Sequence, residues 1–228
     1  MIIFLLVIMT LIAYFGGVYV DNRQVANWIR AICDLFIIGI LALMVANDTF
    51  HFGMQPQVQT TKTTIQSANP HSSLPLLLYK NIGTNGKNRV YIYQANLKTQ
   101  HTSPEQTTIK VKRTSQEPHL VSQKKQWHYR NNFYRALFGV AGNEGHHIQT
   151  VNTFYVPQSW LVLSTGQAKA LPAKLANPQV KARLKQTVSQ QVLAELKQHP
   201  HYSLTQQKQL THQLQTKYQR QALEKLVK

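Results

Sequence analysis

The sequence predicts an N-terminal two-helix transmembrane hairpin, followed by a small α+β domain and a C-terminal pair of amphipathic helices. Three observations lead to this fold class. The first 46 residues are almost wholly apolar, residues 74–164 contain short runs typical of β-strands, and residues 178–228 repeat apolar side chains every four positions. At 228 residues the chain has room for a membrane anchor and one domain of ordinary size.

The first apolar run, residues 1–20, contains no charged side chain. As a helix it has the length needed to cross about 30 Å of hydrocarbon. A cleavable signal peptide is the alternative, but it needs a positively charged start, and this run has no preceding Lys or Arg. A second apolar run follows, which favours an uncleaved transmembrane helix.

The second predicted span covers residues 28–46, after a short loop at 21–27. Trp28 is expected at the membrane interface, where amphipathic rings concentrate. The ionisable residues of this span are Arg30 and Asp34. Their i,i+4 spacing favours neutralisation of Asp34 by Arg30 near the membrane surface. A proton or ion relay at Asp34 is the functional alternative.

The orientation of the hairpin follows from the basic residues of its short loops. Arg23 and Arg30 flank the connection between the spans, whereas the next basic residue after the second span is Lys62. Because short loops rich in Lys and Arg stay inside, we expect the connecting loop inside the cell. The N-terminus and the C-terminal domain are then outside the cell membrane.

The positive charge of the chain lies beyond the hairpin. Residues 1–46 have no net charge, so the entire +17 belongs to residues 47–228, where 23 Lys and Arg face six carboxylates. This excess predicts an anionic partner such as a wall polymer, acidic lipid headgroups or nucleic acid. An outside location disfavours nucleic acid. The single cysteine, Cys33, excludes a disulfide within one chain.

Residues 47–73 are rich in Gln, Thr and Ser without apolar periodicity, and predict a solvated spacer. The α+β domain is expected over residues 74–176. Its first strands are "LPLLLYK" and "RVYIYQA", on either side of the hairpin cue Asn85-Gly86. "TTIKVKRT" (107–114) alternates apolar and basic residues, as a strand with one buried face does. Further strands are expected within residues 119–131, 146–157 and 159–164.

Two helices are predicted within this domain. Asn132 is a candidate N-cap for the first, and Gly142 ends it. Ser164 and Gln167 have the spacing of a capping box, which opens a short helix that Pro172 is expected to break.

The tail, residues 177–228, carries two apolar stripes with four-residue spacing, which predict two amphipathic helices. The stripes are Val180, Leu184, Val188, Val192 and Leu196, then Leu210, Leu214, Tyr218, Ala222 and Leu226. The simplest expectation is that the two helices pack against each other or against the domain. Binding to the membrane surface or to another chain is the alternative.

The strongest candidate binding site is a basic face on the predicted sheet. Trp127 and Tyr129 follow its lysines closely, and basic residues beside aromatics can form a platform for single-stranded nucleic acid. The simpler interpretation is a solvated sheet face with core aromatics behind it. The four lysines of this candidate face are Lys110, Lys112, Lys124 and Lys125.

Motifs for catalysis are not recognisable in the sequence. It contains no G-x-S-x-G, H-E-x-x-H or glycine-rich phosphate loop. Glu144 to His147 is the one local cluster of metal-ligand residue types, but adjacent histidines point to opposite faces of an extended segment. We therefore predict no catalytic residues, no metal and no cofactor.

Several sequence blocks resemble a known family. "LALMVANDTFHFGM", "LLLY", "VYIY", "NNFYRALFGVAGN" and "NTFYVPQSWLVLSTGQAKAL" together look like an uncharacterised membrane-anchored family of Gram-positive bacteria, a domain of unknown function. The resemblance covers roughly residues 35–175. It implies two membrane helices and a small domain, and it transfers no active site.

These observations favour a non-enzymatic envelope protein that presents a basic domain outside the cell. Its partners would be the lipid bilayer and anionic wall polymers or another membrane protein. Two other functions stay open: a wall-remodelling enzyme that uses Glu144 or His147, and an accessory transporter subunit in which Asp34 is functional.

Overall fold

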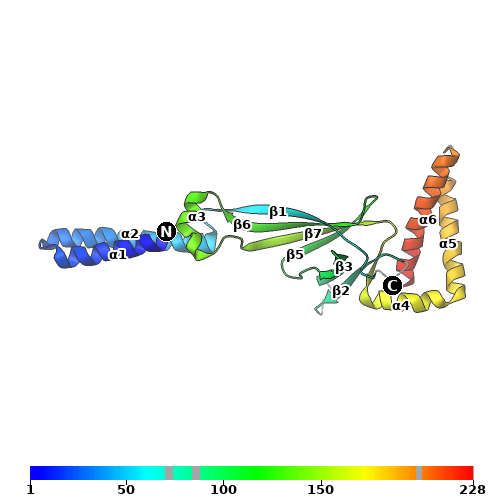
Figure 1. The fold of residues 1–228 in the computed structure, drawn as a ribbon, viewed down its shortest axis with the longest axis horizontal. Coiled ribbons are helices and arrows are strands. Elements are labelled where there is room, and N and C mark those ends of the chain that lie inside the picture. The colour runs from blue at the N-terminus through cyan, green and yellow to red at the C-terminus, as the bar shows by residue number, and fades with distance from the viewer. Residues whose placement is uncertain (70–73, 84–87, 199–201, 228) are drawn as a thin grey trace. The chain divides into compact units, whose positions relative to one another are not determined.

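The computed structural model describes residues 1–69, 74–83, 88–198 and 202–227. It has the predicted order of an apolar helix pair, a β-rich domain and a C-terminal helix pair (Figure 1). The elements are α1 (Ile2–Tyr19), α2 (Arg23–Phe50), β1 (Met54–Thr64), β2 (Leu76–Ile82), β3 (Asn88–Ala95), β4 (Lys98–His101), β5 (Thr107–Thr114), β6 (His119–Tyr129), α3 (Asn132–Phe138), the 3-10 turn η1 (Gly139–Ala141), β7 (His147–Pro157), β8 (Leu161–Ser164), α4 (Thr165–Ala176), α5 (Pro178–Leu196) and α6 (Leu204–Leu226).

The chain divides into two compact units. The first, residues 1–59 with 124–149, is called the hairpin unit below. The second, residues 60–123 with 150–228, is called the basic unit. It contains 19 of the 25 Lys and Arg against four of the eight Asp and Glu, which gives a net charge of +15.

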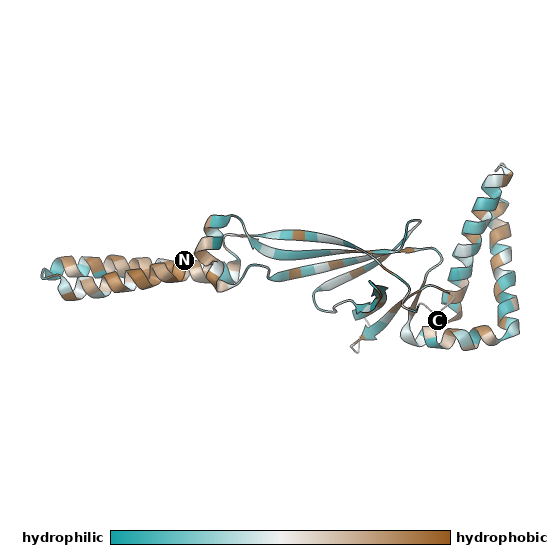
Figure 2. Cartoon of the chain, in the orientation of Figure 1, coloured by the Kyte–Doolittle hydropathy of each residue, from teal (hydrophilic) through white to brown (hydrophobic). Residues whose placement is uncertain are grey.

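Helices α1 and α2 pack along each other within the hairpin unit. Both are long and apolar enough to cross a membrane, and Figure 2 shows hydrophobic residues along both. A Cβ on Gly16 would lie 2.7 Å from Ile29 Cγ2, so the helices are in contact there. Helix α2 starts five residues before the predicted span, because the Asn22 side chain accepts hydrogen bonds from the N–H groups of Gln24 and Val25.

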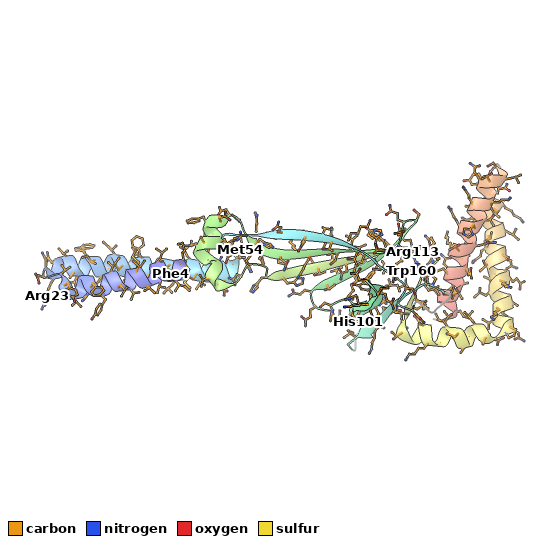
Figure 3. All side chains as sticks on the ribbon, viewed as in Figure 1. Phe4, Arg23, Met54, His101, Arg113 and Trp160 are labelled. Carbon is orange, nitrogen blue, oxygen red and sulfur yellow. The ribbon has the colours of Figure 1, made fainter. Side chains whose placement is uncertain are left out.

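At the other end of the hairpin lies a small core (Figure 3). The helix α3 covers it, and Arg130 Nε donates to the Met54 carbonyl at 3.1 Å. Gly53 has φ +79°, and a Cβ there would lie 2.5 Å from the Tyr134 ring. This position therefore requires glycine. The buried residues of this core are Ile2, Ile40, Met54, Tyr129 and Phe138.

The first sheet has the strand order β1-β6-β7-β5, and β5 pairs with β7 in parallel. Strand β1 occupies residues where the sequence predicts a spacer. It is an edge strand, and all but two of its residues are exposed. A strand that is wet on both faces needs no apolar alternation, which explains why the sequence pattern did not reveal it.

The second sheet has the order β4-β3-β2-β8. Strands β2 and β3 are antiparallel, with Leu78 opposite Ile92, as a hairpin requires. The predicted turn Asn85-Gly86 lies outside the described residues. The main core of the basic unit combines strand residues of both sheets with two residues just outside the strands, Ile65 and Trp160. Its buried members are Ile65, Leu77, Tyr91, Leu120, Phe154, Val156 and Trp160.

Helix α4 opens with the predicted capping box, in which the Ser164 side chain accepts from Gln167 N at 3.1 Å and Gln167 Oε1 accepts from Ser164 N at 2.8 Å. The expected break at Pro172 is wrong, since α4 continues to Ala176. A proline costs the helix one hydrogen bond, but Leu171 and Leu175 on either side of it pack into an apolar cluster with β8 and α6. This packing holds the helix together.

The two tail helices form as the stripes predict. Tyr218 Oη on α6 donates to Glu195 Oε2 on α5 at 3.0 Å, and Val192 and Leu214 are buried. The C-terminal end of α6 joins the sheet, because Leu223 packs in the cluster of Leu161 and Leu171. The tail therefore packs both on itself and on the domain.

Candidate functional site

The side chain of Arg30 on α2 contacts the end of α1. Arg30 Nη2 donates to the Gly17 carbonyl at 3.2 Å, in the last turn of α1. Carbonyls in a last helical turn have no partner within the helix, so a cation there completes the helix end. In residues 1–69, all of which are described, no ion pair joins Arg30 to Asp34.

Two of the four lysines of the predicted basic face lie on β5. Lys110 and Lys112 are exposed on β5, and Lys112 Nζ lies 5.9 Å from the ring centroid of Tyr155, its partner on β7. The His119 ring stacks on the Tyr155 ring, with the two ring centroids 4.8 Å apart. The basic unit thus presents two exposed lysines of β5, of which Lys112 lies beside a stacked aromatic pair.

The aromatics that the sequence singled out, Trp127 and Tyr129, pack within the hairpin unit. Tyr129 is buried in the core of the hairpin unit, and Trp127 packs against it and stacks on His51 at 4.3 Å. Lys124 and Lys125 are exposed on β6 within the hairpin unit. Because successive residues of a strand point to opposite faces, these two lysines do not share one surface.

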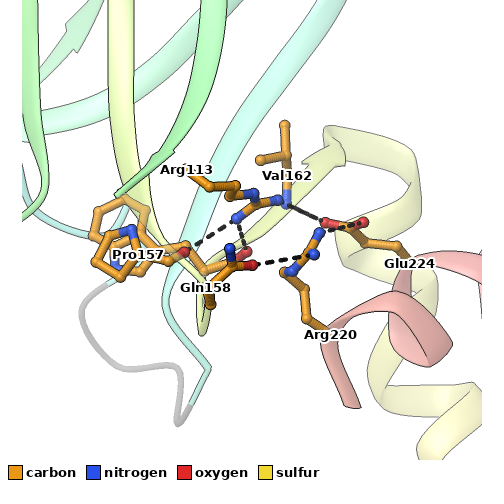
Figure 4. Close-up of polar contacts among 7 residues, drawn as sticks. Arg113, Pro157, Gln158, Val162, Arg220 and Glu224 are labelled. Carbon is orange, nitrogen blue, oxygen red and sulfur yellow. Dashed lines mark hydrogen bonds and ion pairs between the residues drawn. The ribbon is translucent and has the colours of Figure 1, made fainter. Parts of the chain in front are cut away.

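A cluster of charges in the basic unit was not visible from the sequence (Figure 4). Arg113 of β5 donates through Nη1 to the carbonyls of Pro157 and Trp160, at 3.1 and 2.7 Å. Its Nη2 donates to Glu224 Oε1 of α6 at 3.2 Å. Arg220, one turn earlier on α6, donates to Glu224 Oε2 at 3.2 Å.

This cluster brings together two guanidinium groups and one carboxylate, each mostly shielded from water. The exposed fractions of the side chains are 24% for Arg113, 12% for Arg220 and 23% for Glu224. Burial and the nearby Arg220 lower the pKa of Arg113, and Glu224 opposes that shift. Because a second cation lies beside a partly desolvated arginine, this region favours the binding of an additional negatively charged group.

A cavity of about 360 Å³ adjoins the cluster within the basic unit. Arg89 of β3 lines it, with the guanidinium carbon 4.7 Å above the ring centroid of Tyr79. Among the described residues Arg89 has no ion pair. Arg113, Gln167 and Glu224 line the same cavity. An uncompensated guanidinium beside polar groups and aromatic rings can bind an anionic group, such as a phosphate or a carboxylate.

The sequence analysis singled out none of the three arginines Arg89, Arg113 and Arg220. Arg220 and Glu224 have an i,i+4 spacing that indicates an ion pair on one helix. Their link to Arg113 joins residues more than 100 positions apart. Only the packing of α6 on the sheet reveals it.

The Glu144 cluster in the hairpin unit is a salt bridge. Arg135 donates to both carboxylate oxygens of Glu144, through Nη2 at 2.6 Å and Nε at 3.0 Å, and His128 Nδ1 lies 3.5 Å away. The hydrogen bond from Arg135 lowers the pKa of Glu144. Among the described residues, no group of three or more His, Cys, Asp or Glu could hold a metal ion.

Fold and site together define a class of protein in which two candidate membrane helices precede a basic α+β domain. The chain belongs to the family described as Domain of unknown function (DUF4811), whose model matches residues 22–171. The match covers more than half of the chain and confirms the resemblance seen in its sequence blocks. It runs from the start of α2 into α4, and α1, α5 and α6 lie outside it. No curated protein and no solved structure matches the chain.

Proposed function

We propose that this protein is a membrane-anchored, non-enzymatic binding module. The α1–α2 hairpin would span the bilayer, and the basic unit would bind an anionic partner outside the cell. The proposal rests on one observation: exposed apolar surface is concentrated on the hairpin helices, and positive charge is concentrated in the basic unit. The hairpin helices leave most of their apolar side chains exposed, whereas the basic unit holds a net charge of +15.

Support for anchoring comes from the low burial of the hairpin. A core helix of a soluble protein buries its apolar face, but only 6% of the apolar window of α1 and 11% of that of α2 are buried. A cleaved leader would not need to pack with the mature fold. Ile2 and Leu6 of α1 contact the core that contains Met54 and Phe138, so α1 is an integral part of the hairpin unit.

The orientation is proposed from Arg23 and Arg30, which flank the hairpin connection and favour its retention inside the cell. The basic unit would then face the envelope. Anionic wall polymers are the partner that best suits its charge, because they offer repeated phosphates or carboxylates at that location. Arg89 beside its cavity and the exposed Lys110 and Lys112 are the groups proposed to bind them.

The test of binding uses the full-length protein in phosphatidylcholine vesicles, with long-chain polyphosphate as the probe and dextran as the neutral control. We expect polyphosphate to bind and to dissociate as salt is raised, because salt screens exposed charges. Equal retention of polyphosphate and dextran, or binding that is insensitive to salt, would contradict the proposal.

A pair of matched variants tests where the polymer binds. Lys110→Gln with Lys112→Gln removes two charges from β5, and Lys181→Gln with Lys208→Gln removes two from the tail helices, where both lysines are also exposed. We expect the β5 variant to weaken binding more, because Lys112 lies beside Tyr155 and Lys110 is exposed on the same strand. Equal weakening by both variants would mean that only the net charge of the unit matters.

A further inference from the structure

The apolar surface of the hairpin continues beyond the two helices onto η1. A groove of about 310 Å³ lies between the end of the hairpin and this turn, all within the hairpin unit. Ile3 of α1, Val45 of α2 and Val140 of η1 line it, with exposed fractions of 43%, 59% and 61%. The apolar side chains of α1 and α2 that are proposed to contact lipid are therefore continuous, through this groove, with Val140.

Polar contacts fix the position of this turn. The buried Asn47 at the end of α2 donates through Nδ2 to the Phe52 carbonyl at 2.8 Å. The Asn143 Nδ2, just after η1, donates to Asn47 Oδ1 at 3.3 Å. Because both amides are buried and bonded to each other, η1 is held against α2. The groove is therefore held in place by the packing of the hairpin unit.

The neighbouring helix α3 has a polar flank and an apolar flank. Arg135 is held on one flank by Glu144. Phe133 precedes it by two residues, so it projects about 200° away around the helix, and it is 67% exposed. Between these flanks, Tyr134 and Phe138 pack into the core. The apolar flank of α3 therefore has its large side chain directed away from the Arg135–Glu144 salt bridge.

We propose that α3 and η1 lie in the membrane interface, where the groove beside Val140 accepts a lipid acyl chain. This inference rests on the proposed anchoring of the hairpin. Amphipathic segments and aromatic residues concentrate at the boundary between headgroups and acyl chains. The groove is continuous with the lipid-facing surface of α1 and α2, so a bilayer that surrounds the hairpin reaches it without any rearrangement. A lipid thus covers apolar side chains that water would otherwise contact.

The experiment compares three single cysteines in the full-length Cys33→Ala protein. Val140→Cys tests the groove, and Val58→Cys on β1 is the matched control, a valine of the same unit that is also about half exposed. Leu35→Cys on α2 reports on the anchor itself. Each is labelled with an environment-sensitive fluorophore. The protein is placed in phosphatidylcholine–phosphatidylglycerol vesicles without a quencher, or with lipids that carry a nitroxide either near the headgroup end of the acyl chain or deeper in it.

We expect the nitroxide lipids to quench most of the emission at Val140 and to leave emission at Val58 unchanged. Emission at Val140 that is as insensitive as at Val58, while Leu35 is quenched in vesicles with deeper nitroxides, would overturn the interfacial groove and leave the anchor standing. A Leu35 probe that no nitroxide lipid quenches would overturn the anchor as well. If Val140→Cys does not fold, Phe133→Cys replaces it, with the same expected quenching.

Discussion

The described residues form two helical hairpins, and the comparison between them shows how far their outward surfaces differ. In α1–α2 the outward side chains are apolar, including Phe4, Leu35 and Ile38. In α5–α6 apolar residues form one stripe, and the remaining positions are mostly Gln, Lys, Thr and Ser. The geometry of two packed helices is the same, but only the second surface suits water. The side chains that face outward, more than those between the helices, indicate each hairpin's surroundings.

The largest expected effect is the loss of the proposed anchor when a charge is placed in the middle of α2. A charged side chain at the bilayer centre costs about 3 kcal/mol in membrane insertion. Ile38→Arg, at an exposed position of α2, should shift the protein from the alkali-resistant membrane fraction to the soluble or aggregated fraction. The matched control is Gln186→Arg on the exposed side of α5, which should leave the distribution unchanged. An Ile38→Arg protein that stays fully in the membrane fraction would argue against a span at α2.

The tail hairpin should respond instead to loss of its buried stripe. Leu223→Ala removes a side chain that is 4% exposed between α6 and the sheet. We expect a loss of about 2 kcal/mol in the free energy of unfolding, measured with urea, because the deleted atoms leave a cavity. Leu204→Ala, at a position that is 78% exposed, is the control and should change stability little. Equal effects of the two variants would contradict the assigned packing of α6.

The ion pair that holds α6 should contribute less than the apolar contact. Glu224→Gln leaves Arg113 and Arg220 without their carboxylate. We expect destabilisation of about 1 kcal/mol in the same urea assay, since all three side chains keep some contact with water. Glu105→Gln, an exposed carboxylate of the same unit, is the control. If both variants unfold at the same urea concentration as the unchanged protein, the cluster does not hold the helix.

The smallest expected effect concerns the salt bridge of the hairpin unit. The hydrogen bond from Arg135 lowers the pKa of Glu144 in the folded state. This carboxylate therefore stabilises the fold at pH values above its ordinary pKa, and the contribution is lost as pH falls through the lowered folded value. Acid titration should show Glu144→Gln to be less sensitive to pH in that range than the unchanged protein. Identical acid titrations would mean that the pair makes no contribution.

A region could be predicted from the sequence where its packing imposes a repeating pattern of side chains. The apolar runs of α1 and α2 and the four-residue stripes of α5 and α6 are visible because one property repeats along a helix. Strand β1 gave no such signal because almost all of its side chains are exposed. The helix break predicted at Pro172 was wrong because the packing of Leu171 outweighs the local cost of a proline in the helix.

The candidate site was less predictable than the fold for a physical reason. Lys110 and Lys112 were recognisable from strand alternation, but Tyr155, the neighbour of Lys112, lies on a strand that only sheet pairing brings beside β5. Arg113 and Glu224 meet because α6 packs on the sheet. Contacts between segments far apart in the sequence leave no pattern in either segment alone.

The most direct test of the membrane hairpin is the accessibility of cysteines on intact cells. In the Cys33→Ala protein, Thr99→Cys lies on the exposed strand β4 and Asp21→Cys lies in the loop between α1 and α2. With a membrane-impermeant thiol reagent, we expect Thr99→Cys to label on intact cells and Asp21→Cys to label only after the membrane is disrupted. Labelling of Asp21→Cys alone on intact cells would reverse the orientation, and labelling of both would contradict a hairpin that spans the membrane.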